Sequence, residues 1–96
     1  MRTDLSLPQQ IVQAAHAAHE AGIRLGDPYK INAIIVCPVK NEKNLIKEKN
    51  RLDILGLKAI LFREPDLNNQ ATALATEPIS ANKRHFFKHF NLWRPK

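Results

Sequence analysis

His16 is the residue near the start of the chain that is best suited to proton transfer, and three polar residues share its helical spacing. Gln9, Gln13 and Glu20 lie at the intervals that bring side chains onto one side of a helix, so the four would form a single polar stripe. An imidazole flanked by amides could move a proton while the amides hold a polar ligand. The same pattern is also typical of an ordinary amphipathic helix whose histidine bonds a backbone carbonyl.

Both ends of a helix over residues 6–22 are indicated by the sequence. Ser6 and Gln9 form a capping box, and Pro8 falls in the first turn, where its missing N–H costs nothing. Gly22 is placed to adopt the left-handed conformation that ends a helix. Small apolar side chains cover much of the remaining helix surface, and they would allow the helix to pack closely on a sheet.

The composition is typical of one globular domain spanning residues 1–96. Hydrophobic residues make up 44% and charged residues 25% of the chain, and there is neither an apolar run of membrane length nor a signal peptide. The net charge of +6 favours a polyanionic partner, nucleic acid first, although it could also serve solubility alone. We therefore expect no membrane association.

The cysteine and histidine content argues against a disulfide or a metal site. Cys37 is the single cysteine, so it has no partner within the chain, and this indicates a reducing compartment, the cytoplasm. Its place in an apolar run predicts a buried thiol that packs as a small hydrophobe. His85 and His89 are four residues apart but lack an evident third ligand, so no metal site is expected.

The remaining elements predict the α/β class, with parallel crossovers and helices on both faces of the sheet. A turn-rich connector follows the first helix over residues 24–29, and a turn is expected over residues 64–69. Strands are expected at residues 2–5, 31–39, 58–63 and 71–77, and further helices at residues 41–55, begun by Asn41 and ended by Gly56, and 80–92. The first strand is short or truncated. If the domain begins at Met1, the sheet is left with an open edge or gap, and self-association should follow.

Basic and aromatic residues alternate in the last expected helix. Phe86, Phe90 and Trp93 recur at the spacing of a buried face, which predicts packing rather than stacking on bases. The basic residues fall on the other faces, where they would be exposed and available to bind RNA: Lys83, Arg84 and Lys88.

The order of elements and several local stretches resemble the second type of peptidyl-tRNA hydrolase, found in archaea and eukaryotes. The segment from Arg2 to Leu5 is similar to the family's Arg-x-Asp-Leu segment, and Gln13 to Ala17 is similar to its Gln-x-x-His-Ala helix. Residues 87–92 resemble its closing Gly-His-Leu-Lys-Leu. The strands that contain Phe62-Arg63-Glu64 and Thr72-Ala-Leu-Ala fall where the family has its third and fourth strands.

The resemblance implies a mixed sheet of about four strands between helices, often in a homodimer. It also implies hydrolysis of the ester that joins a peptide to the terminal ribose of tRNA, without a metal or an organic cofactor. Such a reaction needs an activated water, donors for the oxyanion and a basic surface for the tRNA.

The chain departs from the family pattern at two places. Gln9 stands where the family has a lysine in the first turn of its helix, and Glu64, with Asp66 nearby, stands where the family has an aspartate followed by a Gly-x-Thr-Gln turn. On the enzyme interpretation Glu64 or Asp66 polarises a water and His16 orients it or shuttles a proton. Substrate-binding residues would be Gln9, Gln13 and Thr72.

Two other functions are compatible with the sequence. The first is a non-catalytic RNA-binding or dimerisation module that keeps the fold and binds tRNA without cleaving it. The second is a general small esterase, which is disfavoured because the only serines, Ser6 and Ser80, lie outside any Gly-x-Ser-x-Gly turn. A carboxylate of Glu64 or Asp66 within reach of His16 and Gln9 would favour the enzyme over the module.

Overall fold

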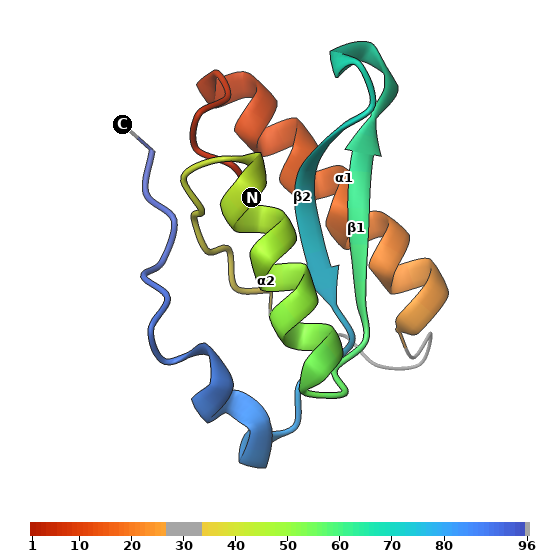
Figure 1. Ribbon diagram of the computed structural model, residues 1–96, viewed down its shortest axis with the longest axis vertical. Helices are drawn as coiled ribbons and strands as arrows, with labels where there is room; N and C mark the ends of the chain where they lie inside the picture. The colour runs from red at the N-terminus through yellow and green to blue at the C-terminus, as the bar shows by residue number, and fades with distance from the viewer. Residues whose placement is uncertain (27–33, 96) are drawn as a thin grey trace.

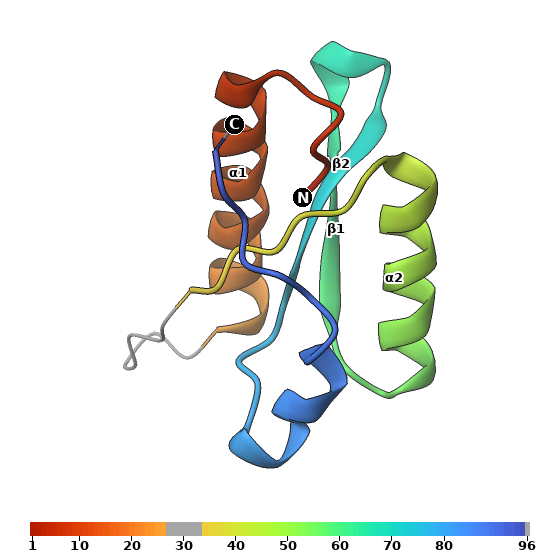
Figure 2. The ribbon, with the colours of Figure 1, turned by 90° about the vertical axis from the view of Figure 1, so that its left-hand side faces the viewer.

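A computed structural model describes residues 1–26 and 34–95 of the chain. Its regular elements are the α-helices α1 (Leu7–Leu25) and α2 (Glu42–Ile54), the strands β1 (Ala59–Glu64) and β2 (Gln70–Thr76), and the short 3-10 helices η1 (Pro65–Leu67) and η2 (Ala81–Phe87). Figures 1 and 2 show three layers, with α1 on one face of the β1–β2 sheet and α2 on the other.

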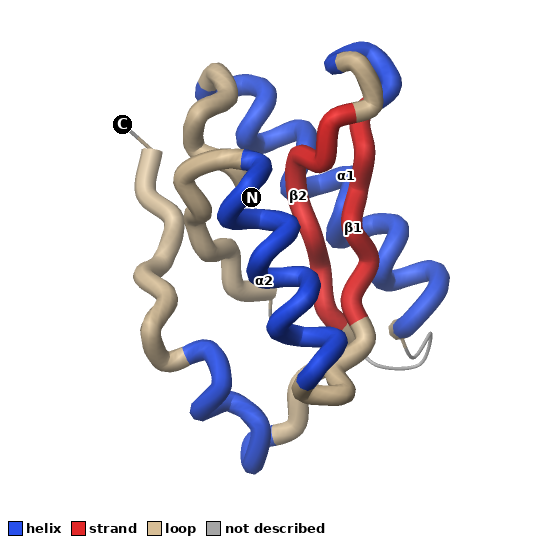
Figure 3. The backbone as a smooth tube through the Cα atoms, in the orientation of Figure 1, coloured by secondary structure: helices blue, strands red, loops and turns tan. Residues whose placement is uncertain are grey.

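The expected four-stranded mixed sheet is wrong. The described residues form only a two-stranded sheet, and its strands are antiparallel (Figure 3). Residues 65–69 alone join β1 to β2, and a parallel pair would need a crossover of a dozen or more residues. The short connection therefore makes a hairpin, which agrees with the turn expected over residues 64–69.

The strands expected at residues 2–5 and 31–39 are reduced to one isolated parallel bridge between Arg2 and Val39. The Val39 N–H donates to the Met1 carbonyl at 2.9 Å, and the Thr3 N–H donates to the Val39 carbonyl at 2.8 Å. Residues 1–3 also contact β2, because the Arg2 N–H donates to the Thr72 carbonyl at 3.1 Å. Pro38 has no N–H to extend this ladder. Residues 31–33 lie outside the described residues.

Helix α1 begins as expected but does not end at Gly22. The Ser6 hydroxyl accepts a hydrogen bond from the Gln9 N–H at 3.4 Å, which confirms the N-cap. Gly22 stays within the helix, and its carbonyl accepts from the N–H of Gly26, the residue that caps the helix. Glycine permits a left-handed stop without imposing one. The expected connector over residues 24–29 therefore begins as helix, and its residues 27–29 lie outside the described residues.

Helix α2 has the two ends that the sequence predicts. The Asn41 side chain accepts from the Asn44 N–H at 2.9 Å, and Gly56, with φ of 74°, follows the last turn. The Leu57 N–H donates to the Leu52 carbonyl at 2.9 Å while both of these leucines are buried, which is the Schellman arrangement.

Replacing Gly56 by alanine is expected to lower the free energy of unfolding by about 1 kcal/mol, because a side chain disfavours the left-handed conformation. Urea denaturation checks this value. The control is Gly22→Ala, at a helical glycine whose added Cβ would meet nothing within 4 Å, and we expect it to leave stability unchanged or raise it. Equal destabilisation by both variants would contradict the assignment of Gly56 as the stop.

The helix expected over residues 80–92 is wrong in kind and length. Only Ala81–Phe87 is helical, and it is a 3-10 helix closed by bonds such as that from the Lys83 N–H to the Ser80 carbonyl. Asparagine, histidine and phenylalanine are modest helix formers, so these residues give an α-helix little intrinsic support. The aromatic residues Phe86, Phe90 and Trp93 are half-buried, in keeping with packing rather than full exposure.

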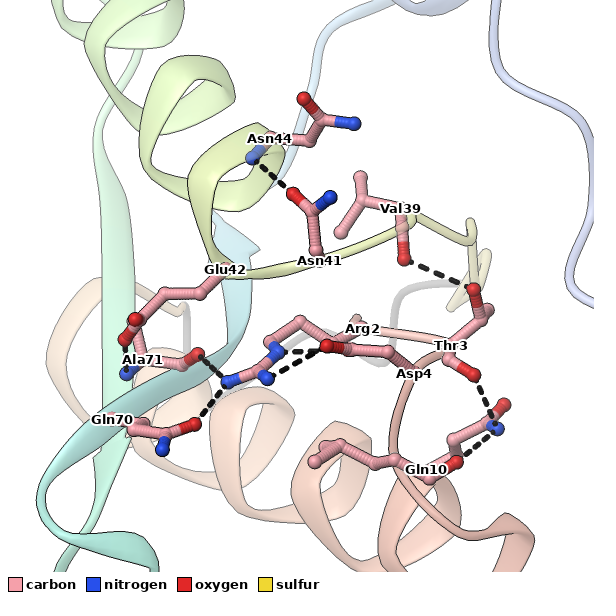
Figure 4. Close-up of polar contacts among 11 residues, drawn as sticks. Arg2, Thr3, Asp4, Gln10, Val39, Asn41, Glu42, Asn44, Gln70 and Ala71 are labelled. Carbon is pink, nitrogen blue, oxygen red and sulfur yellow. Dashed lines mark hydrogen bonds and ion pairs between the residues drawn. The ribbon is translucent and has the colours of Figure 1, made fainter.

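Arg2 ties the start of the chain to β2, as Figure 4 shows. Its side chain is only 9% exposed and donates two hydrogen bonds to the Asp4 carboxylate, at 2.9 and 2.8 Å. The remaining terminal nitrogen, Nη1, donates to Gln70 Oε1 at 2.8 Å and to the Ala71 carbonyl at 3.1 Å. The Ala71 N–H in turn donates to the Glu42 carboxylate at 2.7 Å, so one stretch of β2 is held from both sides.

The Arg2–Asp4 pair gives a pH dependence of stability. The hydrogen bonds from Arg2 lower the pKa of Asp4 below its ordinary value. The resulting stabilisation is fully present above the unfolded pKa of about 3.9 and is lost as the pH falls through the lower folded pKa. In an Asp4→Asn variant, the free energy of unfolding measured in an acid titration should therefore fall less steeply below about pH 4 than in the wild type. Identical acid limbs in the two proteins would contradict this.

Candidate active site

Gln13 is the centre of a polar cluster where α1 crosses the sheet. Its side chain is buried, with the whole residue 1% exposed, yet each end of its amide has partners. The Nε2 group donates to Gln9 Oε1 at 3.0 Å and to Glu64 Oε2 at 3.3 Å, and Oε1 accepts from the Thr72 hydroxyl at 2.6 Å. The structure thus brings together four residues of the expected site from α1, β1 and β2.

An irregularity in β2 places Thr72 in this cluster. Phe62 pairs with Ala73 and the next residue of β1, Arg63, pairs with Ala71, so Thr72 is an extra residue in the ladder. Such a bulge re-aims a side chain, and it occurs often beside functional sites. Thr72 is completely buried, and its hydroxyl serves to hold Gln13 rather than to meet a substrate.

The face of β1 toward α1 carries Phe62 and Glu64, which alternate with Arg63 on the other face. The His16 ring stacks on the Phe62 ring, with 4.8 Å between centroids and 10° between planes. His16 itself is exposed, whereas Glu64 is half-buried beneath Gln13. The exposed His16 ring therefore stacks on Phe62, and Phe62 lies two residues before the Glu64 carboxylate in β1.

Two other acidic residues stay outside this cluster. Asp66 lies in η1, is exposed, and has no hydrogen bond to any residue in the described ranges 1–26 and 34–95. Glu20, the fourth member of the polar stripe, pairs with Arg24 at 2.9 Å on the helix surface. Of the two carboxylates considered for water activation, the geometry favours Glu64.

The expected RNA-binding residues Lys83, Arg84 and Lys88 are exposed at the end of the molecule that carries η2 (Figure 1). Glu64 lies at the opposite end, beside η1. Arg84 and Lys88 line a largely apolar cavity of about 740 Å³, to which none of the expected catalytic residues contributes. The structure therefore does not bring the basic group and the Gln13 cluster together.

The described residues contain no group of three or more histidine, cysteine or acidic side chains arranged to hold a metal ion. Cys37 is half-buried, and burial raises the pKa of its thiol, which disfavours the reactive thiolate. Among the described residues, no helix is both long and apolar enough to cross a membrane.

Phe62 is the site residue that the sequence interpretation missed. The sequence pattern places Phe62 in a strand and indicates no role for it, whereas its ring is the surface on which His16 rests. The available signal was its position two residues before Glu64, which places both side chains on one face of a strand.

Searches with family models, curated proteins and solved structures found no match to this chain.

Proposed function

We propose that the chain hydrolyses the ester bond between a peptide, or an N-blocked amino acid, and tRNA. The observation that carries the proposal is the link from Glu64 through Gln13 to Gln9, beside a stacked and exposed His16. Hydrogen bonds join the Glu64 carboxylate to two amides, and His16 stacks on Phe62, two residues before Glu64 in β1. This grouping supports the enzyme interpretation.

The roles follow from burial. Glu64 uses Oε2 to accept from Gln13, and its other oxygen, which has no hydrogen bond to a residue in the described ranges, polarises a water molecule. His16 takes a proton from this water as its oxygen adds to the ester carbonyl carbon. When the bond from that carbon to the ribose oxygen breaks, His16 returns the proton to the ribose. The products are a free carboxylic acid and tRNA.

The buried residues hold the exposed ones in place. Gln13 and Thr72 are too buried to contact a substrate, so in this proposal they orient Glu64 and Gln9. Gln9 is the half-buried member of the Gln13 cluster that lies in the first turn of α1, and it can offer its amide to a ribose or phosphate oxygen. The net charge of +6 suits a tRNA substrate, and the cytoplasm is the compartment in which we place the reaction.

The second candidate is a module of the same chain that binds tRNA without cleaving it. It is favoured by the separation between the exposed basic residues of η2 and the Gln13 cluster. It is also favoured by Gln9, because an uncharged amide supplies neither a charge nor a proton. This candidate requires affinity for tRNA that falls steeply with salt, and no turnover.

The two candidates are separated by release of an N-blocked amino acid from tRNA. We expect His16→Ala and Glu64→Gln each to lower the rate by about 10²–10⁴-fold, the usual contribution of a positioned acid or base. The matched control is Glu20→Gln, because Glu20 is a half-buried acid on the same helix that pairs with Arg24, and this variant should keep the rate. A rate that persists in Glu64→Gln but falls in Asp66→Asn would assign water activation to Asp66 instead.

A further inference from the structure

The cavity of about 740 Å³ is separate from the Gln13 cluster and is large enough for a small molecule. Residues of α1, α2 and β2 line it, and residues of the segments 34–39 and 77–92 complete its wall. Its volume is within the range of about 300–1,000 Å³ that is usual for ligand sites. None of the residues to which we assign a role in hydrolysis contributes to this wall.

The helices give the cavity an aliphatic wall. Helix α1 contributes the small side chains of Ala14, Ala18 and Ala21, which leave space beside the helix. Helix α2 contributes Leu45 and Leu52, which are 1% and 0% exposed. Such a wall offers apolar contact and few groups that could recognise a polar ligand.

Three further aliphatic residues of the wall are largely open to solvent. Ile34, Ile35 and Leu92 are 74%, 64% and 60% exposed, and all three line the cavity. Exposed apolar side chains that gather on one concave surface indicate a ligand-binding groove. An apolar ligand would cover part of this surface, and the removal of that surface from water favours binding.

The charged side chains of the wall differ in whether they have partners. Glu48 pairs with an arginine of α2, and the Glu77 carboxylate accepts at 2.6 Å from the backbone N–H of the residue before β1. The side chains of Arg84 and Lys88 have no hydrogen bond or ion pair with any residue of the ranges 1–26 and 34–95. Both are exposed, so they lie where the cavity opens to solvent and offer two cations to an anionic group.

We propose that this cavity binds a fatty acid, with the alkyl tail between the helices and the carboxylate at Arg84 and Lys88. This inference does not depend on the hydrolytic function. A neutral apolar ligand would leave the two cations without a partner. A polyanion such as RNA would meet the cations but would leave the aliphatic wall exposed.

The ligand class is tested by calorimetric titration of the full chain with octanoate, decanoate and dodecanoate, all below the concentrations at which they form micelles. We expect each added methylene to lower the dissociation constant by about fourfold, as burial of a CH₂ group should. Decan-1-ol has the tail of decanoate without its charge, and we expect it to bind roughly tenfold more weakly.

The position of the tail is tested by filling the cavity. Ala18→Leu places a larger side chain in the wall, whereas Ala15→Leu is the matched control, because Ala15 is exposed on the same helix and does not line the cavity. We expect Ala18→Leu to raise the dissociation constant of dodecanoate at least about tenfold and Ala15→Leu to leave it unchanged. Gly22→Leu is a second filling variant, since a Cβ added there meets nothing within 4 Å and should not disturb the fold.

The position of the carboxylate is tested by the double variant Arg84→Gln, Lys88→Gln. Exposed ion pairs are individually weak, so we expect the two changes together to raise the dissociation constant of decanoate about tenfold. The affinity for decan-1-ol should not change. Lys83→Gln is the matched control, because Lys83 is exposed on η2 but does not line the cavity, and it should keep the affinity for both ligands.

Several results would overturn the proposal. They are a failure of dodecanoate to bind, an equal affinity for decanoate and decan-1-ol, and binding that neither filling variant weakens. Strand β2 pairs only with β1 among the described residues, so an extended peptide is the competing occupant of the cavity. Tighter binding of a neutral, blocked peptide of alternating alanine and valine than of dodecanoate would therefore also overturn it.

Discussion

Replacing Arg2 by methionine is expected to lower the free energy of unfolding by about 2–4 kcal/mol. The substitution keeps most of the apolar stem but removes a guanidinium that bonds the Asp4 carboxylate, the Gln70 amide and the Ala71 carbonyl. Hydrogen bonds to a charged group contribute about 1.5–3 kcal/mol, and breaking a buried pair leaves the partner uncompensated. Asp4 is 39% exposed, so water recovers part of the loss, which places the effect below the sum of the separate bonds.

Urea denaturation of Arg2→Met beside Arg24→Met measures this effect. Arg24 also pairs with a carboxylate, but its side chain is 60% exposed, and pairs of this kind contribute no more than about 0.5 kcal/mol. Similar losses in the two variants would show that the Arg2 network adds nothing beyond a surface ion pair.

Replacing Gln13 by leucine should cost about 2–3 kcal/mol, although the side chains are similar in size. Leucine cannot accept from the buried Thr72 hydroxyl or donate to Glu64, so a hydroxyl with no access to water loses its partner. An unpaired buried polar group costs about 1–3 kcal/mol. In the double variant Gln13→Leu, Thr72→Val both partners become apolar, and much of the lost stability should return.

The same double variant separates the structural role of the cluster from its proposed role in hydrolysis. If Gln13 only fills the interior, restoring stability should restore the rate. We expect stability to recover while the rate stays low, because nothing then orients Glu64 and Gln9. Thermal unfolding and ester release measured on the same preparations distinguish the two outcomes.

Local signals predicted those parts of the fold that depend on a few adjacent residues. The helix ends were predictable at Ser6, Asn41 and Gly56, because each depends on one side chain or one φ angle. Gly22 does not end α1, because its flexibility permits both a helical and a left-handed conformation, and nothing nearby forces the second.

The sheet could not be predicted in the same way, because pairing depends on where distant segments lie. Residues 34–39 are as apolar as a strand, but Pro38 has no N–H to donate, and the only bridge that these residues form is at Val39. The polar stripe was predicted from helical spacing, and three of its members lie at the site. The bulge at Thr72 and the stacking of His16 on Phe62 were not predictable, because each needs the register of β1 against β2.

The most direct test of the proposed site measures binding and cleavage of an N-blocked aminoacyl-tRNA on one sample, at low and high salt, for the wild type and Glu64→Gln. We predict that both proteins bind the tRNA with the same salt dependence, and that only the wild type releases the blocked amino acid faster than the spontaneous rate. Salt-sensitive binding without release by the wild type would contradict the hydrolase and leave the tRNA-binding module. Equal release by both proteins would remove Glu64 from the chemistry.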